Sequence, residues 1–340
     1  MKLSSFHALL VAAASLAAHA AADFKVTPEP IVKAATSRHV KYVKQWTLSA
    51  GAKTNSIDSI DLSLAGNAYV SYVSDLPTGV LGYVNVSGDS RTVVNAVTVS
   101  KDVDSDLDSE SDSDSDFDDL LENDTNNGGE LNVWLGDKAA SGYLLTEIFL
   151  AEPEAVMDVK SQRSAQVVIE DGVLVNTGKR AELQIDATGS TAVYVSAPDA
   201  DASVGQLSLE TTGTASIEYN VNSLSVRSDL QMDAQGSSSI TVLSSTLKTS
   251  QLDLSAVRKA SICISAQEVK TVRRAIEGKN KISLPNSTKK HGTTGASTCE
   301  ESTLPARKAA KITGASGMST GSGDDLGIDL GIDLTASNLF

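Results

Sequence analysis

Residues 181–265 contain one phrase four times: AELQIDATGSTAVYVS (181–196), GQLSLETTGTASIEYN (205–220), SDLQMDAQGSSSITVLS (228–244) and SQLDLSAVRKASICIS (250–265). Each copy has an apolar anchor, and the anchors are spaced by 24, 23 and 22 residues: Leu183, Leu207, Leu230 and Leu252. Self-similarity at a period of 20–50 residues is typical of solenoids and other repeat arrays.

The copies share more than their anchors. A second apolar residue stands two positions after each anchor: Ile185, Leu209, Met232 and Leu254. The first three copies carry a glycine at plus six: Gly189, Gly213 and Gly236. β-Branched residues at plus ten are followed by apolar residues at plus twelve: Val193 and Val195, Ile217 and Tyr219, Ile240 and Val242, Ile262 and Ile264. This alternation predicts two short strands per copy, joined by a turn.

The same template extends towards the N-terminus. It fits again at Ile60, with Gly66 at plus six, and with less agreement at three anchors that lack the glycine: Val84, Val133 and Met157. Stacking such units about 4.8 Å apart would align their apolar residues into one continuous core. We therefore expect an all-β fold, a parallel β-solenoid of about eight coils. An antiparallel sandwich of many short strands is the main structural rival, but it does not require a repeated phrase.

Composition divides the chain further. Residues 1–22 resemble a secretory signal peptide, because Lys2 precedes a short apolar run and small residues. We expect an N-terminal cap over residues 23–56, the solenoid over 57–268, and a helical cap with a low-complexity, disordered tail over 269–340. No stretch after the signal is long and apolar enough to predict a membrane span.

Charge is unevenly distributed along the chain, whose net charge is −15. The run from Asp102 to Asp124 holds twelve carboxylates and no base, so residues 101–129 are expected to be a disordered acidic insertion between coils. A solvating loop is the favoured interpretation of this run, and low-affinity calcium capture or phosphorylation of its serines is the alternative. We expect no nucleic-acid partner, because the pattern predicts no basic stripe on the repeats.

Outward positions of the repeat are the candidate binding residues. An acidic row at plus three consists of Asp186, Glu210 and Asp233, and calcium bridging this row is a hypothesis beside that of a solvated face. A hydroxyl row follows the glycines: Ser190, Thr214 and Ser237. Such hydroxyls either bind sugars or hydrogen-bond along the stacked turns. Two outward aromatic residues, Trp134 and Tyr194, could stack on a sugar ring or simply cover a strand.

N-glycosylation sequons and two cysteines are further features expected of an exported protein. Three N-glycosylation sequons begin at Asn85, Asn123 and Asn286. Cys263 and Cys299 could pair in an oxidising compartment and fasten the tail to the last copy, or remain free thiols.

The Leu-x-apolar, Gly and apolar-x-apolar phrases from Leu183 to Val242, with the related copy from Ile60 to Tyr72, resemble the auto-transporter adhesin head GIN domain family. The resemblance covers residues 57–264, with the acidic run as an insertion. It implies a right-handed β-solenoid at or outside the cell surface. It supplies no functional residues. No membrane translocator follows the repeats, which departs from a true autotransporter.

These observations favour a secreted, non-catalytic, adhesin-like protein that needs no cofactor apart from the hypothetical calcium. Its expected partner is a cell-wall polysaccharide or a surface protein. The alternatives are a carbohydrate-active β-helical enzyme using carboxylates such as Asp186, Glu210 and Asp233, and a matrix component that self-associates end to end. No GxSxG, HExxH or P-loop motif is present in the sequence.

Overall fold

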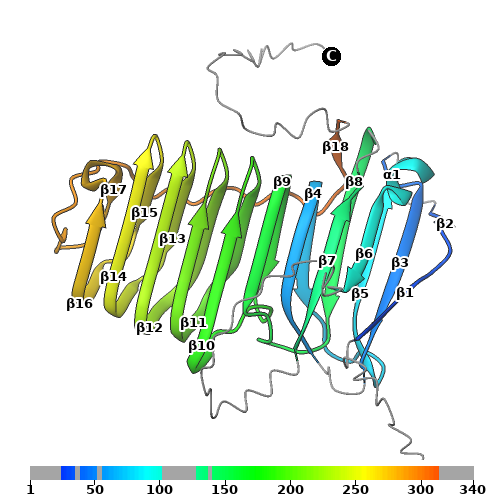
Figure 1. Cartoon of the computed structure of the whole chain (residues 1–340), viewed down its shortest axis with the longest axis horizontal. Helices are drawn as coiled ribbons and strands as arrows, with labels where there is room; N and C mark the ends of the chain where they lie inside the picture. Colours follow the sequence, from blue (N-terminus) through cyan, green and yellow to red (C-terminus); the bar gives the residue numbers. More distant parts are fainter. Residues whose placement is uncertain (1–23, 35–38, 52–55, 102–127, 137–139, 314–340) are drawn as a thin grey trace, which may run out of the picture.

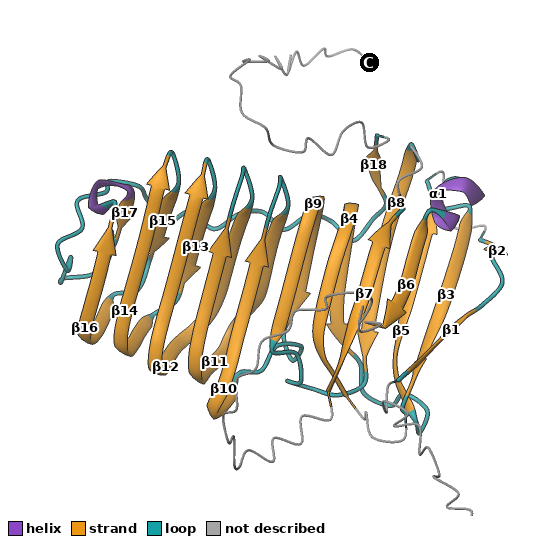
Figure 2. Cartoon of the chain, viewed as in Figure 1, coloured by secondary structure: helices purple, strands orange, loops and turns teal. Residues whose placement is uncertain are grey.

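The structure is a computed structural model that describes residues 24–34, 39–51, 56–101, 128–136 and 140–313. Eighteen strands form one continuous hydrogen-bonded sheet, which winds into a long, flat rod (Figures 1 and 2). The described helices are short: α1 (Arg91–Asn95) and the 3-10 helix η1 (Lys279–Lys281). Among the described residues, neither helix has the length and apolar character needed to cross a membrane.

The first nine strands are β1 (Lys25–Pro28), β2 (Val32–Lys33), β3 (Tyr42–Ser49), β4 (Ser56–Tyr72), β5 (Val80–Gly88), β6 (Val97–Lys101), β7 (Gly128–Leu135), β8 (Gly142–Leu150) and β9 (Asp158–Glu170). The other nine are β10 (Thr177–Ala187), β11 (Ala192–Thr211), β12 (Ser216–Gly236), β13 (Ser239–Leu243), β14 (Thr246–Arg258), β15 (Ser261–Ile264), β16 (Glu268–Glu277), β17 (Ile282–Ser283) and β18 (Ala310–Ile312).

The four copies stack in parallel and in register, as their spacing predicts. Leu183 pairs with Leu207, Leu207 with Leu230, and Leu230 with Leu252. The second strands of the copies are aligned in the same way, through Val193, Ile217, Ile240 and Ile262. All these side chains are almost completely buried. The prediction of an all-β, parallel β-solenoid is confirmed, with about five turns rather than eight coils.

The coils from β10 to β16 also have a third parallel stretch that the sequence pattern did not reveal. Ala202, Leu224, Leu247 and Val269 pair in succession and are buried. Register shifts separate this stretch from the anchor strand, between Val204 and Leu207 in β11 and between Val226 and Asp229 in β12. The shifts break the strict alternation, which is why a period-two template did not reveal the third stretch.

The N-terminal half departs from the simple series. Val84 does not begin a coil, because β5 is antiparallel to both β3 and β8. β4 lies between β9 on one side and β7 with β8 on the other, so the coils are not stacked in chain order there (Figure 1). Ile60 pairs with Leu131 and Val159, two positions away from the alignment expected with Val133 and Met157.

Residues 268–277 are a strand, so the helical cap expected after the repeats is wrong. β16 continues the parallel stack on β14, with Leu247 opposite Val269 and Leu254 opposite Ile276. The β-branched residues of EVKTVRRAIE favour a strand, and the template stacked beside it selects that conformation. Arg274 stands opposite Leu252 and is exposed. This last coil therefore presents a polar outer face, as terminal solenoid units do.

The structure describes only parts of the acidic insertion and of the two ends of the chain. The acidic insertion lies outside the described residues except for its flanks in β6 and β7, and so do the signal peptide and residues 314–340. Residues 284–313, expected to be disordered, have a defined path. The chain runs back along the solenoid from β17, and β18 pairs antiparallel with β8 (Figure 1). At the opposite end from β16, β1 and β2 pair antiparallel with β3.

A column of glycines turns the chain after each anchor strand. Gly189, Gly213 and Gly236 have φ angles of 77°, 81° and 88°, a region that L side chains rarely adopt. The turns are also in close contact, because a Cβ on Gly213 would lie 2.6 Å from the carbonyl oxygen of Gly189. Arg163 and Arg258 take the same left-handed turn at the two ends of the column, with φ of 73° and 61°.

We predict that Gly213→Ala lowers the free energy of unfolding by about 2–3 kcal/mol, because it combines a left-handed backbone with a backbone clash. Gly79→Ala is the matched control: its φ is 83°, but nothing lies within 4 Å of the added Cβ. This control should cost about 1 kcal/mol. Chemical denaturation of both variants measures the difference, and equal losses would contradict the close packing of the turns.

Candidate binding surface

The outward side chains of the anchor strands form a polar face. Because paired residues of stacked parallel strands lie about 4.8 Å apart, each position of the repeat becomes a row. The predicted acidic row is one of them: Asp186 pairs with Glu210, Glu210 with Asp233, and Asp233 with Ser255. Glu277 extends the row on β16. The sequence spacing thus placed these carboxylates side by side correctly.

Side-chain amides hold the aspartates of this face. Gln184 Nε2 donates to Asp186 Oδ2 at 2.9 Å, and Gln251 Nε2 donates to Asp253 Oδ2 at 2.6 Å. In both aspartates the other carboxylate oxygen, Oδ1, is buried and lacks a hydrogen-bond partner. Asp233 Oδ1 is in the same situation. Each of these carboxylates is therefore partly desolvated and incompletely satisfied.

The row's electrostatics follow from this geometry. Burial raises the pKa of the Asp186 carboxyl; the Gln184 hydrogen bond and Lys160 oppose the shift, and the charge of Asp158 adds to it. Burial also raises the pKa of Glu210, with further contributions from the charges of Asp186 and Asp233. Both carboxyls therefore bind protons more tightly in the folded chain than in the unfolded chain, where an ordinary pKa is near 4.

We predict that Asp186→Asn raises the free energy of unfolding at pH 7, by about 0.2–1 kcal/mol, because it removes a partly buried like charge. As pH rises from the unfolded pKa through the raised folded pKa, the folded state binds more protons than the unfolded state, so the wild-type chain loses stability. The gain in the variant should consequently shrink towards zero near pH 4. Urea unfolding at both pH values measures it.

The control for this variant is Glu182→Gln, which removes an exposed carboxylate from the same strand and should change stability little at either pH. A gain for Asp186→Asn that is equal at pH 4 and pH 7 would contradict the raised pKa.

Thermal unfolding with millimolar Ca²⁺ or with a chelator tests separately whether calcium bridges the acidic row. Within the part of the chain that the structure describes, no three or more His, Cys, Asp or Glu converge as metal ligands. Calcium binding stays a prediction.

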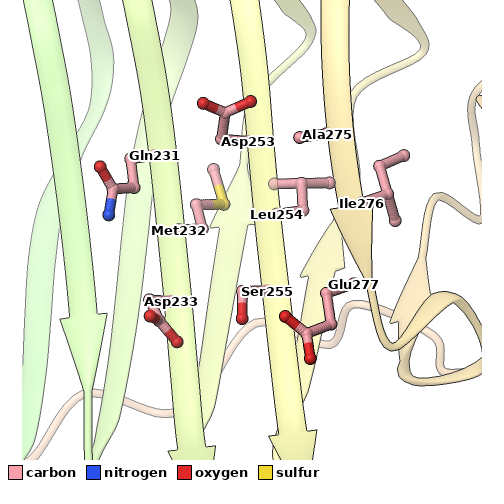
Figure 3. Close-up of a pocket in the computed structure, with 9 residues that line it drawn as sticks. All are labelled: Gln231, Met232, Asp233, Asp253, Leu254, Ser255, Ala275, Ile276 and Glu277. Carbon is pink, nitrogen blue, oxygen red and sulfur yellow. The ribbon is translucent and has the colours of Figure 1, made fainter.

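A groove of about 420 Å³ opens at the β16 end of the polar face. Figure 3 shows its residues, which come from three neighbouring strands, β12, β14 and β16. The polar groups in it are Gln231, Asp233, Asp253, Ser255 and Glu277, and its apolar lining is Met232, Leu254, Ala275 and Ile276. Met232 and Leu254 are buried, so the apolar surface open to a ligand comes from Ala275 and Ile276. Carboxylate acceptors, an amide and a hydroxyl beside this small apolar surface are groups that can hydrogen-bond and pack against a sugar.

The predicted hydroxyl row lies on the turns. Ser190, Thr214 and Ser237 are exposed, and each follows a glycine of the turn column. Ser190 Oγ donates to Arg163 O at 3.1 Å, and Thr214 Oγ1 donates to Gly189 O at 3.2 Å. Two of these hydroxyls therefore hydrogen-bond along the stacked turns, which is the alternative to sugar binding.

Of the two predicted aromatic residues, Trp134 stands on the outward side of the anchor strands and Tyr194 does not. Trp134 is half-buried on β7, opposite Ser63 and Thr98. Tyr194 packs against an apolar cluster that includes Tyr69 and Val168. Burial raises the pKa of its hydroxyl, and the charge of Glu218 adds to the shift. Trp134 shares its outward side with Asn132, whose row leads through the strand pairing to Asp186, so only Tyr194 lies apart from the polar face.

The sequence did not predict the path of the segment that covers Tyr194 and its neighbours. Residues 297–312, here called the strap, follow a single outward row across the coils: Glu147, Tyr69, Val168, Tyr194, Glu218, Thr241, Cys263 and Ser283. A disulfide joins Cys263 to Cys299 in the strap, with a Cα–Cα distance of 5.4 Å. Further along, the Ser302 amide donates to Glu218 Oε2 at 3.0 Å.

Contacts at the far end of the strap are charged and aromatic. Arg307 donates to Ser71 Oγ at 2.6 Å and to Glu170 Oε1 at 2.8 Å, and its guanidinium lies 4.7 Å from the centre of the Tyr69 ring. The Tyr69 hydroxyl donates to Pro305 O. Asn67 Nδ2 donates to two strap carbonyls, of Ala306 and Lys308. The only sequence signals were Cys299 and the outward Tyr69, Val168 and Tyr194.

The sequons occupy different environments. Asn85 is half-buried on β5, between Gln45 of β3 and Glu147 of β8. Asn286 is exposed, and its Nδ2 donates to Ser265 O at 2.9 Å. Asn123 lies outside the described residues. Glycosylation stays a prediction at all three positions.

Comparison with known proteins gives little. No protein-family model matches the chain, and no curated protein matches it significantly. A crystal structure described as a "putative adhesin" from Bacteroides fragilis NCTC 9343 matches with a TM-score of 0.35 and 12% identity, over 74% of this chain and 95% of that one. A TM-score this low carries no argument, so the fold stands on the strand pairing alone. The resemblance to the GIN domain family stays an expectation.

Proposed function

We propose that this chain is an exported, adhesin-like binding protein whose polar face holds an extended polysaccharide of a cell wall or cell surface. The observation that carries the proposal is the in-register polar face, with its groove at Gln231, Asp253 and Glu277. A solenoid repeats the same surface at a fixed interval, and a polymer repeats the same chemical groups, so the two match over many units.

Further observations support the proposal. Residues 1–22 have the composition of a secretory signal peptide, and the disulfide between Cys263 and Cys299 suits an oxidising compartment. Carboxylate and amide groups of the face can pair with sugar hydroxyls, which act both as donors and as acceptors. The resemblance to the GIN domain family adds the expectation of a surface role.

The test is a pull-down of the full chain with insoluble cellulose, chitin, mannan, β-glucan and pectate. We expect retention on at least one polymer without new reducing ends or unsaturated sugars. The double variant Gln231→Ala/Glu277→Ala removes two exposed polar groups of the groove and should weaken retention at least about threefold.

The matched control is Gln267→Ala/Glu152→Ala, which removes the same two side-chain types at exposed positions outside the groove. Retention equal in both double variants would place binding elsewhere. No retention on any polymer would contradict the proposal. New reducing ends or unsaturated sugars would instead support the carbohydrate-active enzyme, and sedimentation of the chain alone would support a self-assembling matrix component.

A further inference from the structure

A second groove lies at a corner of the solenoid, where each third stretch leads into the anchor strand that follows it. Its volume is about 520 Å³. The strands β10, β11, β12, β14 and β16 all contribute to its lining, which consists of Arg180, Glu182, Gly205, Gln206, Arg227, Ser228, Ser250 and Arg273. Because every second coil supplies an arginine, the lining has three arginines against one carboxylate.

An arginine recurs in every second coil. The pairing places Gly205 in the coil between Arg180 and Arg227, and Ser250 in the coil between Arg227 and Arg273. Two coil steps, about 10 Å along the rod, separate Arg180 from Arg227, and two more lead to Arg273. Because Arg273 pairs with Gln251, and Gln251 with Asp229, it lies two residues further along its strand than Arg227 does. The small residues in the intervening coils leave the space between the arginine side chains open. This is a basic row on the repeats, which the sequence pattern did not predict.

These guanidinium groups are available to a ligand. Arg180, Arg227 and Arg273 are exposed, and none lies within 4 Å of a carboxylate oxygen in the part of the chain that the structure describes. Ser250 Oγ is held by the carbonyl oxygen of Arg227, at 2.6 Å. Arginine binds planar anions such as carboxylate and sulfate through two parallel hydrogen bonds.

We propose that this arginine groove binds an anionic polysaccharide that carries a carboxylate or sulfate on alternate sugars. An extended disaccharide has about the length of two coil steps, so each anionic group would meet one arginine. Gln206 and Ser228 can hydrogen-bond the hydroxyls of the intervening sugars. The proposal rests on the proposed function in that the ligand is again a polysaccharide, but the residues are different.

Features of the groove disfavour a nucleic acid. A nucleic-acid strand carries one phosphate per 3.4 Å or so, about three times the density of these arginines. Single-stranded nucleic acids also stack their bases on aromatic side chains. No aromatic residue is present in the groove lining, and Glu182 would repel a densely charged polymer.

The test measures binding of the full chain to immobilised hyaluronan, which has one carboxylate per disaccharide, to chondroitin sulfate, to neutral dextran and to single-stranded DNA. The variant Arg180→Gln/Arg227→Gln/Arg273→Gln removes the row. The control Lys259→Gln/Lys279→Gln/Lys289→Gln removes the same net charge at exposed positions outside the groove.

We expect binding to one or both anionic polysaccharides, weakened by salt, and no binding to dextran. The arginine variant should bind about tenfold more weakly, and the lysine control should match the wild-type chain. Both polymers carry one uronate carboxylate per disaccharide, and chondroitin sulfate carries a sulfate in addition. Equal binding to the two would show that the carboxylate is enough, and tighter binding to chondroitin sulfate would show that the sulfate is recognised as well.

Three results would overturn the inference: no binding to either anionic polysaccharide, equal weakening in the lysine control, or tighter binding to DNA. The variants at Gln231 and Glu277 act on the other groove. If the chain is retained on a neutral wall polymer but does not bind either anionic polysaccharide, the proposed function therefore stands and only the arginine groove is refuted. Because all substituted side chains are exposed, thermal melts should show that each variant folds as the wild type does.

Discussion

Parallel stacking of coils in register is the constraint on which the rest of this molecule depends. One coil cannot bury its apolar side chains, but each stacked neighbour covers them and supplies backbone hydrogen bonds at the same time. The anchor leucines therefore form part of the core, and their pairing fixes the register of the coils: Leu183, Leu207, Leu230 and Leu252. A slip of one residue would turn these side chains outward and the acidic row inward, which no other interaction could offset.

The same register sets what the surface can do. Each outward position becomes a row, and the rows differ in whether another segment covers them. The row that contains Tyr69, Val168 and Tyr194 lies under the strap, so it contributes packing. The acidic row and the arginine row face outward, on adjoining parts of the anchor strands. Rows of opposite charge therefore lie next to each other on the anchor strands.

The sequence predicted the interior well and the exterior only in part. Strict alternation around Leu207 and Leu230 allowed both strands and their pairing to be predicted, since burial leaves little freedom at such positions. The third stretch was missed because register shifts interrupt the alternation. The strand at residues 268–277 was misassigned because its anchor position holds Arg274, and a degenerate terminal coil resembles an amphipathic helix.

The strap and the arginine groove were harder to foresee for another reason. The strap is held by contacts between residues more than two hundred positions apart, such as Arg307 with Ser71, which no local pattern encodes. The arginine groove did have a signal, since Arg180 and Arg227 both stand three residues before an anchor leucine. Its third member, Arg273, does not keep that offset, and only the pairing brings the three together.

The most direct test of this account is the distance between spin labels along one outward row. Labels on cysteines introduced at Gln184 and at Gln231, Asp253 or Ala275 stand two, three and four coils apart. Stacking in register predicts backbone separations of about 10, 14 and 19 Å, which rise by one strand spacing per coil. Separations that do not rise in equal steps, as in an antiparallel sandwich, would contradict it.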